Sequence, residues 1–333
     1  MMYAKTMLSY TTLVGLLITT SGCMHLPPYR MKRKKVVLTK PNCPTTTFAD
    51  AQHLAAINDS LATHIDIENQ KPTITIWIHG TRLLPNPVFQ AYMYSPAGLN
   101  PITDLDKSFH LRQLADAIIN ADPQRYPLDH FYIFGWSGKL DADVRKQAAE
   151  KLYAQLLQLI ESYEQKNKTK PDIRIITHSH GGNIALHLAD MNTPTKPVEI
   201  QELILLACPV QEKTMHHIKN DMFKKTYALY SSLDMLQVLA PQFMYRIERK
   251  NSKKHKTDLK LPLFSARRFA PEPKLAQIKI KINGHAIFHT TFTSANFTRL
   301  LPKIIDEINA WQMQEPQYPF DKPDTRRLMS IYA

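Results

Sequence analysis

The chain has 333 residues, of which 44% are hydrophobic, and its formal net charge is +13. This hydrophobic content is enough for a full core and excludes wholesale disorder. The positive charge favours contact with anionic surfaces. However, the sequence has no zinc-finger spacing, RNA-binding signature or basic stripe interleaved with aromatic residues, so we expect no nucleic-acid partner.

The N-terminus has the pattern of a secretory signal. Lys5 precedes the mostly apolar run Leu13–Ile18, and small residues follow as far as Cys23. This order predicts a signal peptide over residues 1–22. Ser21-Gly22-Cys23 resembles the end of a bacterial lipobox, although Thr20 stands where Leu is usual. We therefore expect Cys23 to carry a lipid that anchors the protein in the cell envelope. The alternatives are an ordinary signal peptide, which would give a secreted protein, and an uncleaved anchor helix.

Residues 23–47 are basic and rich in Pro and Thr, which predicts a tether rather than part of a core. The cluster Arg30–Lys35 would add attraction to lipid headgroups beside a lipid anchor. An anionic membrane surface is therefore an expected partner, and a solvated linker is the alternative reading of the same cluster.

Residues 48–312 alternate short apolar runs with helical patterns. Asp141 is placed to cap one helix, whose apolar residues recur at helical spacing from Val144 to Leu159, and a last helix is expected from Ser294 to Trp311. The expected strands are Thr73–Ile78, Phe131–Phe134, Ile173–Thr177, Glu202–Ala207, Thr226–Ser231 and Ile278–Ile282. Strands separated by helices predict an α/β fold with a mostly parallel central sheet and helices on both faces.

Two segments depart from this alternation. The insertion at about residues 241–274 is basic and includes Phe264 and Phe269. We expect it at the rim of the active site, where it either docks on an anionic bilayer or is a solvated loop. Residues 313–333 are Pro-rich and predict a trailing tail.

Two further cysteines, Cys43 and Cys208, could pair in an oxidising compartment. Cys208 lies in the apolar run Leu203–Val210, whereas Cys43 lies in the Pro/Thr-rich leader. A buried thiol at Cys208 is therefore the favoured reading.

The most informative motif surrounds Ser179. It follows the strand Ile173–Thr177 and precedes a helix that begins near Gly181. Function in α/β sheets gathers beyond the carboxyl ends of the strands. Against the nucleophile pattern G-x-S-x-G, Gly181 matches and Thr177 replaces the first glycine. A serine that only caps a helix is the structural alternative.

A metal site at the same turn is the other alternative. His178 and His180 could supply two ligands, but alternate residues around a tight turn diverge. No H-E-x-x-H motif or Cys/His cluster completes the ligand set. The pattern favours a serine nucleophile with no metal and no cofactor.

With the His-Ser-x-Gly-Gly elbow at His178–Gly182, the chain resembles lipase- and esterase-like members of the α/β-hydrolase superfamily over about residues 72–312. The resemblance implies an acid after a later strand and a histidine near the C-terminal end. Asp234 follows the strand that contains Tyr227, and His285 follows Ile278–Ile282 in a glycine turn.

In this reading His285 removes the proton of Ser179, and Asp234 orients the imidazole. His289 is the rival base and Asp221 the rival acid. His216 and His217 lie in a helical, Lys-rich context and are expected on the surface.

Backbone N–H groups must stabilise the oxyanion of the tetrahedral intermediate. The amide of His180 is one expected donor, and the amide of Thr81 is the second because His79-Gly80-Thr81 resembles the oxyanion turn of the family. The imidazole of His79 is expected to have a structural role. Trp136 either lines the pocket or packs against the next helix.

These features predict a serine hydrolase that cleaves carboxylic esters through an acyl-enzyme. Lipid acyl esters are the favoured substrates, because the expected anchor and basic segments would hold the enzyme at a membrane. A small-ester esterase or acyltransferase is the nearest alternative. A non-catalytic lipoprotein that uses the fold as a binding module is the alternative from another class.

Overall fold

The computed structural model describes residues 32–36, 71–81, 95–195, 197–239, 265–314 and 327–331. The expected signal peptide and lipidation site, Cys43, and residues 241–264 of the basic insertion lie outside these ranges. Among the described helices, none combines the length and the apolar character needed to cross a membrane.

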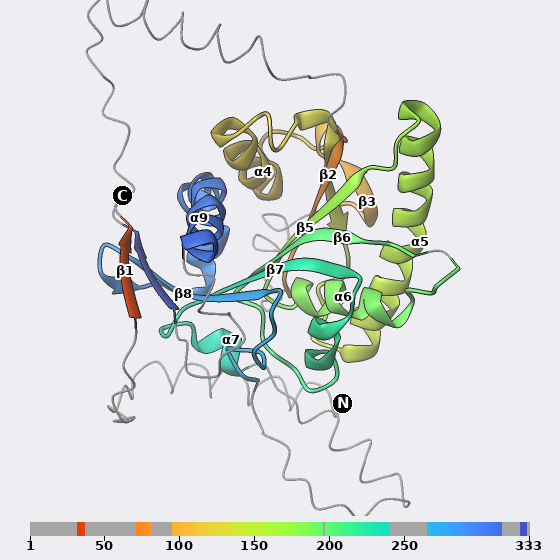
Figure 1. The fold of residues 1–333 in the computed structure, drawn as a ribbon. Helices are drawn as coiled ribbons and strands as arrows, with labels where there is room; N and C mark the ends of the chain where they lie inside the picture. The colour runs from red at the N-terminus through yellow and green to blue at the C-terminus, as the bar shows by residue number, and fades with distance from the viewer. Residues whose placement is uncertain are drawn as a thin grey trace, which may run out of the picture. The chain divides into compact units, whose positions relative to one another are not determined.

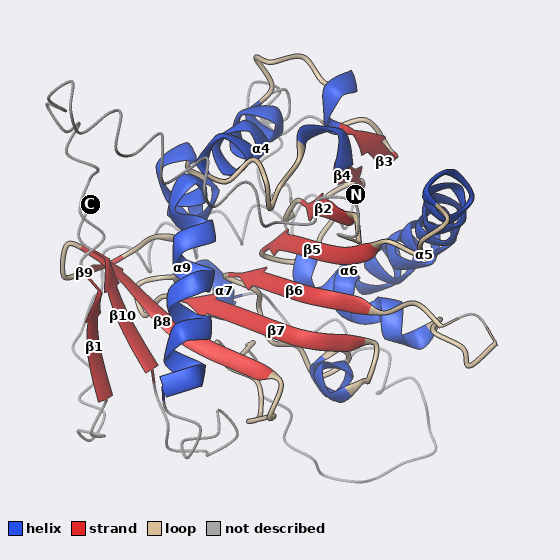
Figure 2. Cartoon of the chain, turned by 45° about the horizontal axis from the view of Figure 1, so that its top comes forward, coloured by secondary structure: helices blue, strands red, loops and turns tan. Residues whose placement is uncertain are grey.

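The described strands form one 10-stranded sheet in the order β1-β10-β8-β7-β6-β5-β2-β4-β3, with β9 paired to β8 (Figures 1 and 2). Every neighbouring pair is parallel except β3 with β4 and β9 with β8. The strands are β1 (Lys32–Val36), β2 (Thr73–Ile78), β3 (Gly98–Pro101), β4 (Phe131–Gly135), β5 (Asp172–His178), β6 (Ile200–Leu206), β7 (Phe223–Tyr230), β8 (Leu275–Ile282), β9 (His285–Ala286) and β10 (Arg327–Ile331).

Helices cover both faces of this sheet (Figure 2). One face carries α4 (His110–Ala121) and α9 (Ala295–Gln314), and the other carries α5 (Ala142–Asn167) and α6 (Gly181–His187). The two faces have separate hydrophobic cores: Trp77 of β2 belongs to the first, whereas its neighbours Ile76 and Ile78 belong to the second. A strand buried on both faces must be apolar at nearly every position, which explains the continuous apolar runs of the sequence.

The predicted α/β fold is confirmed, as are the six strands expected from the apolar runs, within a few residues at their ends. The cap of α5 is confirmed too, because the Asp141 carboxylate accepts hydrogen bonds from the N–H groups of Asp143 and Val144. The short strand β3 and helix α4 were not predicted.

The two ends of the chain depart from the expectation of a tether and a tail. β1 lies inside the expected tether, and β10 lies inside the expected Pro-rich tail. β10 pairs with β8 on one side and β1 on the other, and the side chains of Met329 and Ile331 are fully buried. Three prolines precede β10 in residues 313–333, so its five residues were predicted as part of a tail rather than as a strand.

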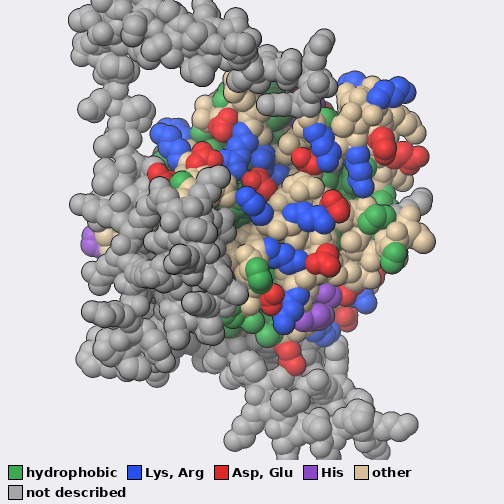
Figure 3. Space-filling model, viewed as in Figure 1, with side chains coloured by type: hydrophobic (Ala, Val, Ile, Leu, Met, Phe, Trp, Pro, Cys, Tyr) green, Lys and Arg blue, Asp and Glu red, His purple; other side chains and the backbone are tan. Residues whose placement is uncertain are grey.

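The described part of the basic insertion also differs from an exposed docking rim. Phe269 is buried in the second core, and Arg267 is partly buried beside Asp234, whose backbone oxygen accepts a hydrogen bond from its guanidinium. On the face drawn in Figure 3, Lys and Arg side chains are interspersed with Asp and Glu. Cys208 is a buried free thiol, as the favoured reading predicted, and burial raises its pKa.

Candidate active site

Ser179 lies in the turn between β5 and α6 with a left-handed backbone, at a φ of 53°. This conformation is unusual for a residue with a side chain and costs on the order of 1–3 kcal/mol. It persists because the surroundings hold it: the Ser179 N–H donates to the Leu206 oxygen of β6 at 2.8 Å. A serine strained at a strand-to-helix turn is the geometry of a nucleophile elbow.

Thr177 fits where the motif has its first glycine. Its side chain is fully buried, and its hydroxyl donates to the Ile204 oxygen of β6 at 3.2 Å. The close approach that requires glycine occurs at Gly181 instead, where a Cβ would lie 2.5 Å from the Ile78 oxygen. The departure from G-x-S-x-G therefore leaves the elbow intact.

Asp234 stands just beyond the carboxyl end of β7, before α7 (Met235–Leu239), and both oxygens of its buried carboxylate have partners. Oδ1 accepts from the N–H of Gln237 at 3.0 Å, and Oδ2 accepts from Nδ1 of His289 at 2.7 Å. The rival acid Asp221 lies in solvent beside Lys274. The structure thus gives Asp234, rather than Asp221, a histidine partner.

The expected pairing of Asp234 with His285 is wrong, and His289 occupies that position. Asn283 and Gly284 both have positive φ, at 49° and 80°, and make the tight hairpin between β8 and β9. An Asn-Gly pair is typical of such a hairpin because both central residues need positive φ. The hairpin leaves His285 exposed and turns the chain back, so that His289 reaches Asp234 four residues later.

His178 connects the Asp234–His289 pair to the elbow. Its Nε2–H donates to the backbone oxygen of His289 at 3.2 Å, and the two rings lie 4.5 Å apart. Burial, and secondarily the nearby His289, lowers the pKa of His178 well below its usual value. His178 is therefore neutral near pH 7. Because His178 directly precedes Ser179, its hydrogen bond holds the His289 loop beside the nucleophile elbow.

Ser231 is a positioning residue that the sequence analysis missed. Its hydroxyl accepts hydrogen bonds from the N–H groups of Ile287 at 3.0 Å and Leu233 at 3.3 Å. One side chain thereby joins the turn that carries Asp234 to the loop that carries His289. Its place at the end of β7, between strand and acid, was the available signal.

The two expected oxyanion donors belong to the elbow itself and to the turn after β2 that packs against it. His180 is the N-cap of α6, and Thr81 follows Gly80, where an added Cβ would lie 2.8 Å from the Ser179 Cβ. The turn after β2 therefore packs directly against the elbow. His180 is buried, and burial, with a smaller contribution from Arg145, lowers its pKa.

The imidazole of His79 has the structural role expected of it. Its Nδ1 hydrogen bonds to the Gly80 oxygen at 2.7 Å, and its Nε2 accepts from the backbone N–H of Trp136 at 3.3 Å. The indole of Trp136 donates to the His79 oxygen at 2.8 Å and stacks on the imidazole. The pair fixes the turn that carries Thr81.

A second group of ionisable side chains gathers after α6. His216 is exposed as expected, but His217 is buried and lies beside Asp190, which also contacts His187. The expectation of a surface position is therefore wrong for His217. Burial lowers the pKa of both His187 and His217 below the usual value, because its effect outweighs the opposing effect of Asp190.

No protein-family model matches the chain, and no curated protein sequence matches it. Several solved structures are similar. An esterase from the fungus Rhizomucor miehei aligns at 12% identity over 76% of this chain and 78% of its own, with a TM-score of 0.36. Carboxyl esterase 2 from Tuber melanosporum aligns at 12% identity over 75% and 78%, with a TM-score of 0.37.

Phospholipase PlaB from Legionella pneumophila, solved in complex with thio-NAD, aligns at 17% identity with a TM-score of 0.25. That match covers 41% of this chain and only 25% of the phospholipase. A mostly parallel sheet covered on both faces, with a strained serine between β5 and α6, is the α/β-hydrolase fold.

Proposed function

We propose that the protein is a serine hydrolase that cleaves carboxylic esters, with Ser179 as nucleophile, His289 as general base and Asp234 as the orienting acid. The observation that carries this proposal is the buried Asp234–His289 pair, held by His178 against a serine with a φ of 53°. An activated serine needs a base, and the base needs a partner that fixes its tautomer. Asp234 accepts from Nδ1–H of His289, which leaves Nε2 as the proton acceptor.

In the first half of the reaction, Nε2 of His289 takes the Ser179 proton as Oγ bonds to the ester carbonyl carbon. The carbonyl oxygen becomes an oxyanion stabilised by the amides of His180 and Thr81. When the C–O bond to the alcohol breaks, His289 gives its proton to the leaving oxygen. Water then repeats the sequence on the acyl-enzyme, releasing the acid and restoring Ser179.

Lipid acyl esters are the favoured substrate class because exposed apolar side chains flank the residues of the proposed triad. Phe288, which precedes His289, is 64% exposed, and Leu233 and Met235 on either side of Asp234 are 43% and 49% exposed. We call these three residues the apolar rim. Large apolar side chains grouped in solvent are typical of surfaces that meet a lipid or another apolar partner.

Lipidation of Cys23 in the cell envelope belongs to this proposal, as does attraction of the basic segments to an anionic membrane. Both would bring the apolar rim to its substrate. Mass spectrometry of the mature protein, compared with Cys23→Ser, tests the anchor: an intact first residue, or unchanged membrane attachment in the variant, would refute it.

Labelling with a fluorophosphonate probe tests the chemistry most directly. Wild type should be labelled and should hydrolyse p-nitrophenyl esters, whereas Ser179→Ala should do neither while keeping its circular dichroism spectrum. Wild-type activity in Ser179→Ala would show that Ser179 is not the nucleophile. A folded wild type without labelling or turnover would favour the binding module. Ester transfer to an added alcohol in preference to water would identify an acyltransferase.

The apolar rim can be tested separately from the chemistry. Phe288→Ser combined with Leu233→Ser should lower the activity on vesicles of long-chain phospholipid and spare a soluble short-chain ester. Leu128→Ser is the matched control, since Leu128 is also exposed, at 38%, but belongs to the distant 3-10 helix before β4. Equal activity of the double variant and the control on vesicles would favour the small-ester esterase.

A further inference from the structure

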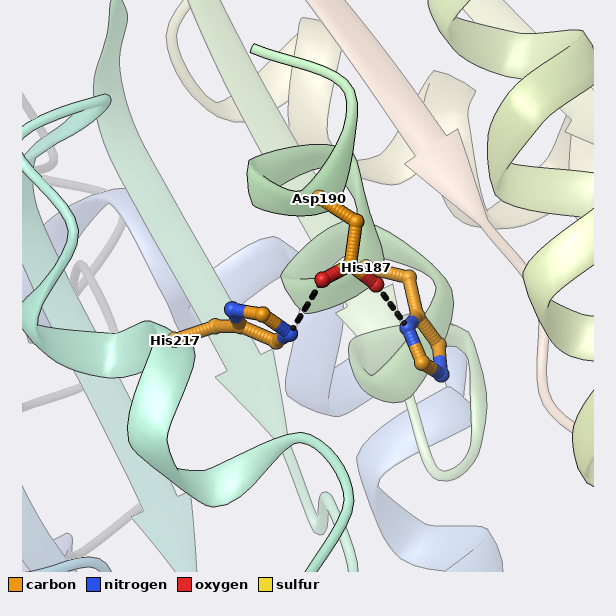
Figure 4. Close-up of side chains that lie close together, drawn as sticks. All are labelled: His187, Asp190 and His217. Atoms are coloured by element: carbon orange, nitrogen blue, oxygen red, sulfur yellow. Dashed lines mark hydrogen bonds and ion pairs between the residues drawn. The ribbon is translucent and has the colours of Figure 1, made fainter.

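Three side chains outside the proposed active site lie where they could share one metal ion. They are His187 at the end of α6, Asp190 in the 3-10 helix η4 (Leu188–Asp190) and His217 in the 3-10 helix η5 (Met215–Lys219). One atom from each residue lies within 4.8 Å of the others. Figure 4 shows the Asp190 carboxylate between the two imidazoles, with one oxygen directed at each.

We propose that His187, Asp190 and His217 form a binding site for a divalent transition-metal ion of the zinc type. Two imidazoles and one carboxylate are a ligand set that zinc uses, with water able to fill the fourth tetrahedral position. The three side chains come from two segments separated by β6, and these segments must fold together for the site to exist.

The distances need little adjustment to accept an ion. Oδ2 of Asp190 lies 2.8 Å from Nδ1 of His187, and Oδ1 of Asp190 lies 3.0 Å from Nε2 of His217. Ligands about 2.0–2.2 Å from a tetrahedral zinc ion lie about 3.3 Å from one another. Side-chain rotations would open these two contacts by a few tenths of an ångström. They would also bring the two imidazole nitrogens, which lie within 4.8 Å of each other, to the separation that the ion requires.

In the structure the same three residues form one hydrogen bond, between His187 and Asp190, and one close polar contact, between His217 and Asp190. Binding would move the proton of each neutral imidazole to its other ring nitrogen, so that no net proton is released. Both histidines are buried, whereas Asp190 is exposed and gives the ion a path from solvent. The buried imidazoles would fix the positions of two metal ligands, and the Asp190 carboxylate would supply a negative charge to the ion.

The role that fits this position is structural. His187 is eight residues beyond Ser179, about 12 Å along a helix, too far for an ion to touch the ester. An ion here would clamp the C-terminal end of α6 to the segment between β6 and β7. The inference is independent of the ester chemistry, because metal binding can be measured on Ser179→Ala as well as on wild type.

The test uses the full chain, stripped with a chelator and dialysed. Calorimetry with Zn²⁺ and visible absorption with Co²⁺ should show one equivalent bound, and Zn²⁺ should raise the melting temperature. His187→Gln, His217→Gln and Asp190→Asn should each weaken the binding at least about tenfold. Measuring the shift caused by metal, rather than the melting temperature itself, separates lost ligation from lost packing.

His285→Gln is the matched control, because it removes an exposed histidine from the β8–β9 turn and should leave binding unchanged. The chain has 14 histidines, so adventitious surface binding is the main rival. The proposal is overturned if the wild type binds no Zn²⁺ or Co²⁺. It is also overturned if the three ligand variants bind as tightly as His285→Gln.

Discussion

At the scale of single residues, the choice of base decides the mechanism. His289→Ala should lower kcat by about 10³-fold or more, because members of a triad act as a unit. His285→Ala should retain near wild-type kcat, since its side chain lies in solvent on the hairpin. Steady-state kinetics on one soluble ester decides between them. An active His289→Ala with an inactive His285→Ala would reverse the assignment.

His178 gives a second prediction at this scale, as a positioning residue. His178→Ala loses the hydrogen bond to the His289 oxygen and should lower kcat by about 10-fold or more with a smaller change in KM. His178→Gln places an amide N–H close to the original Nε2–H and should recover part of kcat. A purely structural role predicts instead that kcat stays normal in whatever fraction of the variant folds.

The histidine assignment also shows where sequence reasoning reached its limit. Ser179 and Asp234 were found because each follows the end of a recognisable buried strand. His285 met the same criterion, but the criterion ignores where the chain turns. The Asn283-Gly284 pair was the missing signal, because it predicts a two-residue hairpin that closes on His285. The burial of His217 beside Asp190 depends on a tertiary contact that no local pattern encodes.

At the scale of elements, Glu202 joins β6 to β5 and to the loop after α4. Its carboxylate pairs with Arg174 at 2.5 Å and with Arg125 at 3.1 Å. Burial raises the pKa of Glu202, but the two arginines outweigh it and hold the pKa below its ordinary value of 4.5. A depressed pKa contributes stability above pH 4.5, and that contribution is lost as the pH falls through the folded pKa.

Glu202→Gln should therefore lower the free energy of unfolding by about 3 kcal/mol at pH 7, because it leaves two partly buried guanidinium groups without their carboxylate. The difference from wild type should shrink as the pH falls below 4.5. Glu199→Gln is the matched control: Glu199 pairs with Lys224 in solvent and should cost less than about 1 kcal/mol. Urea titrations at pH 7 and pH 4 measure both. A constant difference between the two pH values would contradict the linkage.

Element existence was predictable wherever apolar runs were long, as in β2, β5 and β6, because strands buried on both faces leave little room for polar residues. The short β3, Gly98–Pro101, gave no such run. α4 has apolar residues at helical spacing, so this helix was predictable from the sequence although it was not predicted. β1 and β10 have five residues each. The basic or Pro-rich composition of the segments around them predicted a tether and a tail instead of strands.

At the scale of the whole molecule, the position of β10 between β8 and β1 has a consequence for folding. Residues 32–36 and 327–331 pair in register, so this border of the sheet closes only when both distant segments are present. Contacts of such long sequence separation form slowly, because the chain loses loop-closure entropy before the contact contributes any stability. Until then, β7 and the short β9 are the neighbours of β8 among the described strands.

An open border of this kind is a template for pairing with another chain. A chain that ends after Gln314 should keep Ser179, Asp234 and His289, yet it would lose β10 and with it the partner of β1. We expect it to be soluble only at low concentration and to form β-rich aggregates on refolding, detected by light scattering and thioflavin fluorescence. Full-length chains would be most vulnerable during synthesis, in the interval after β8 has emerged and before the final strand arrives to cover it.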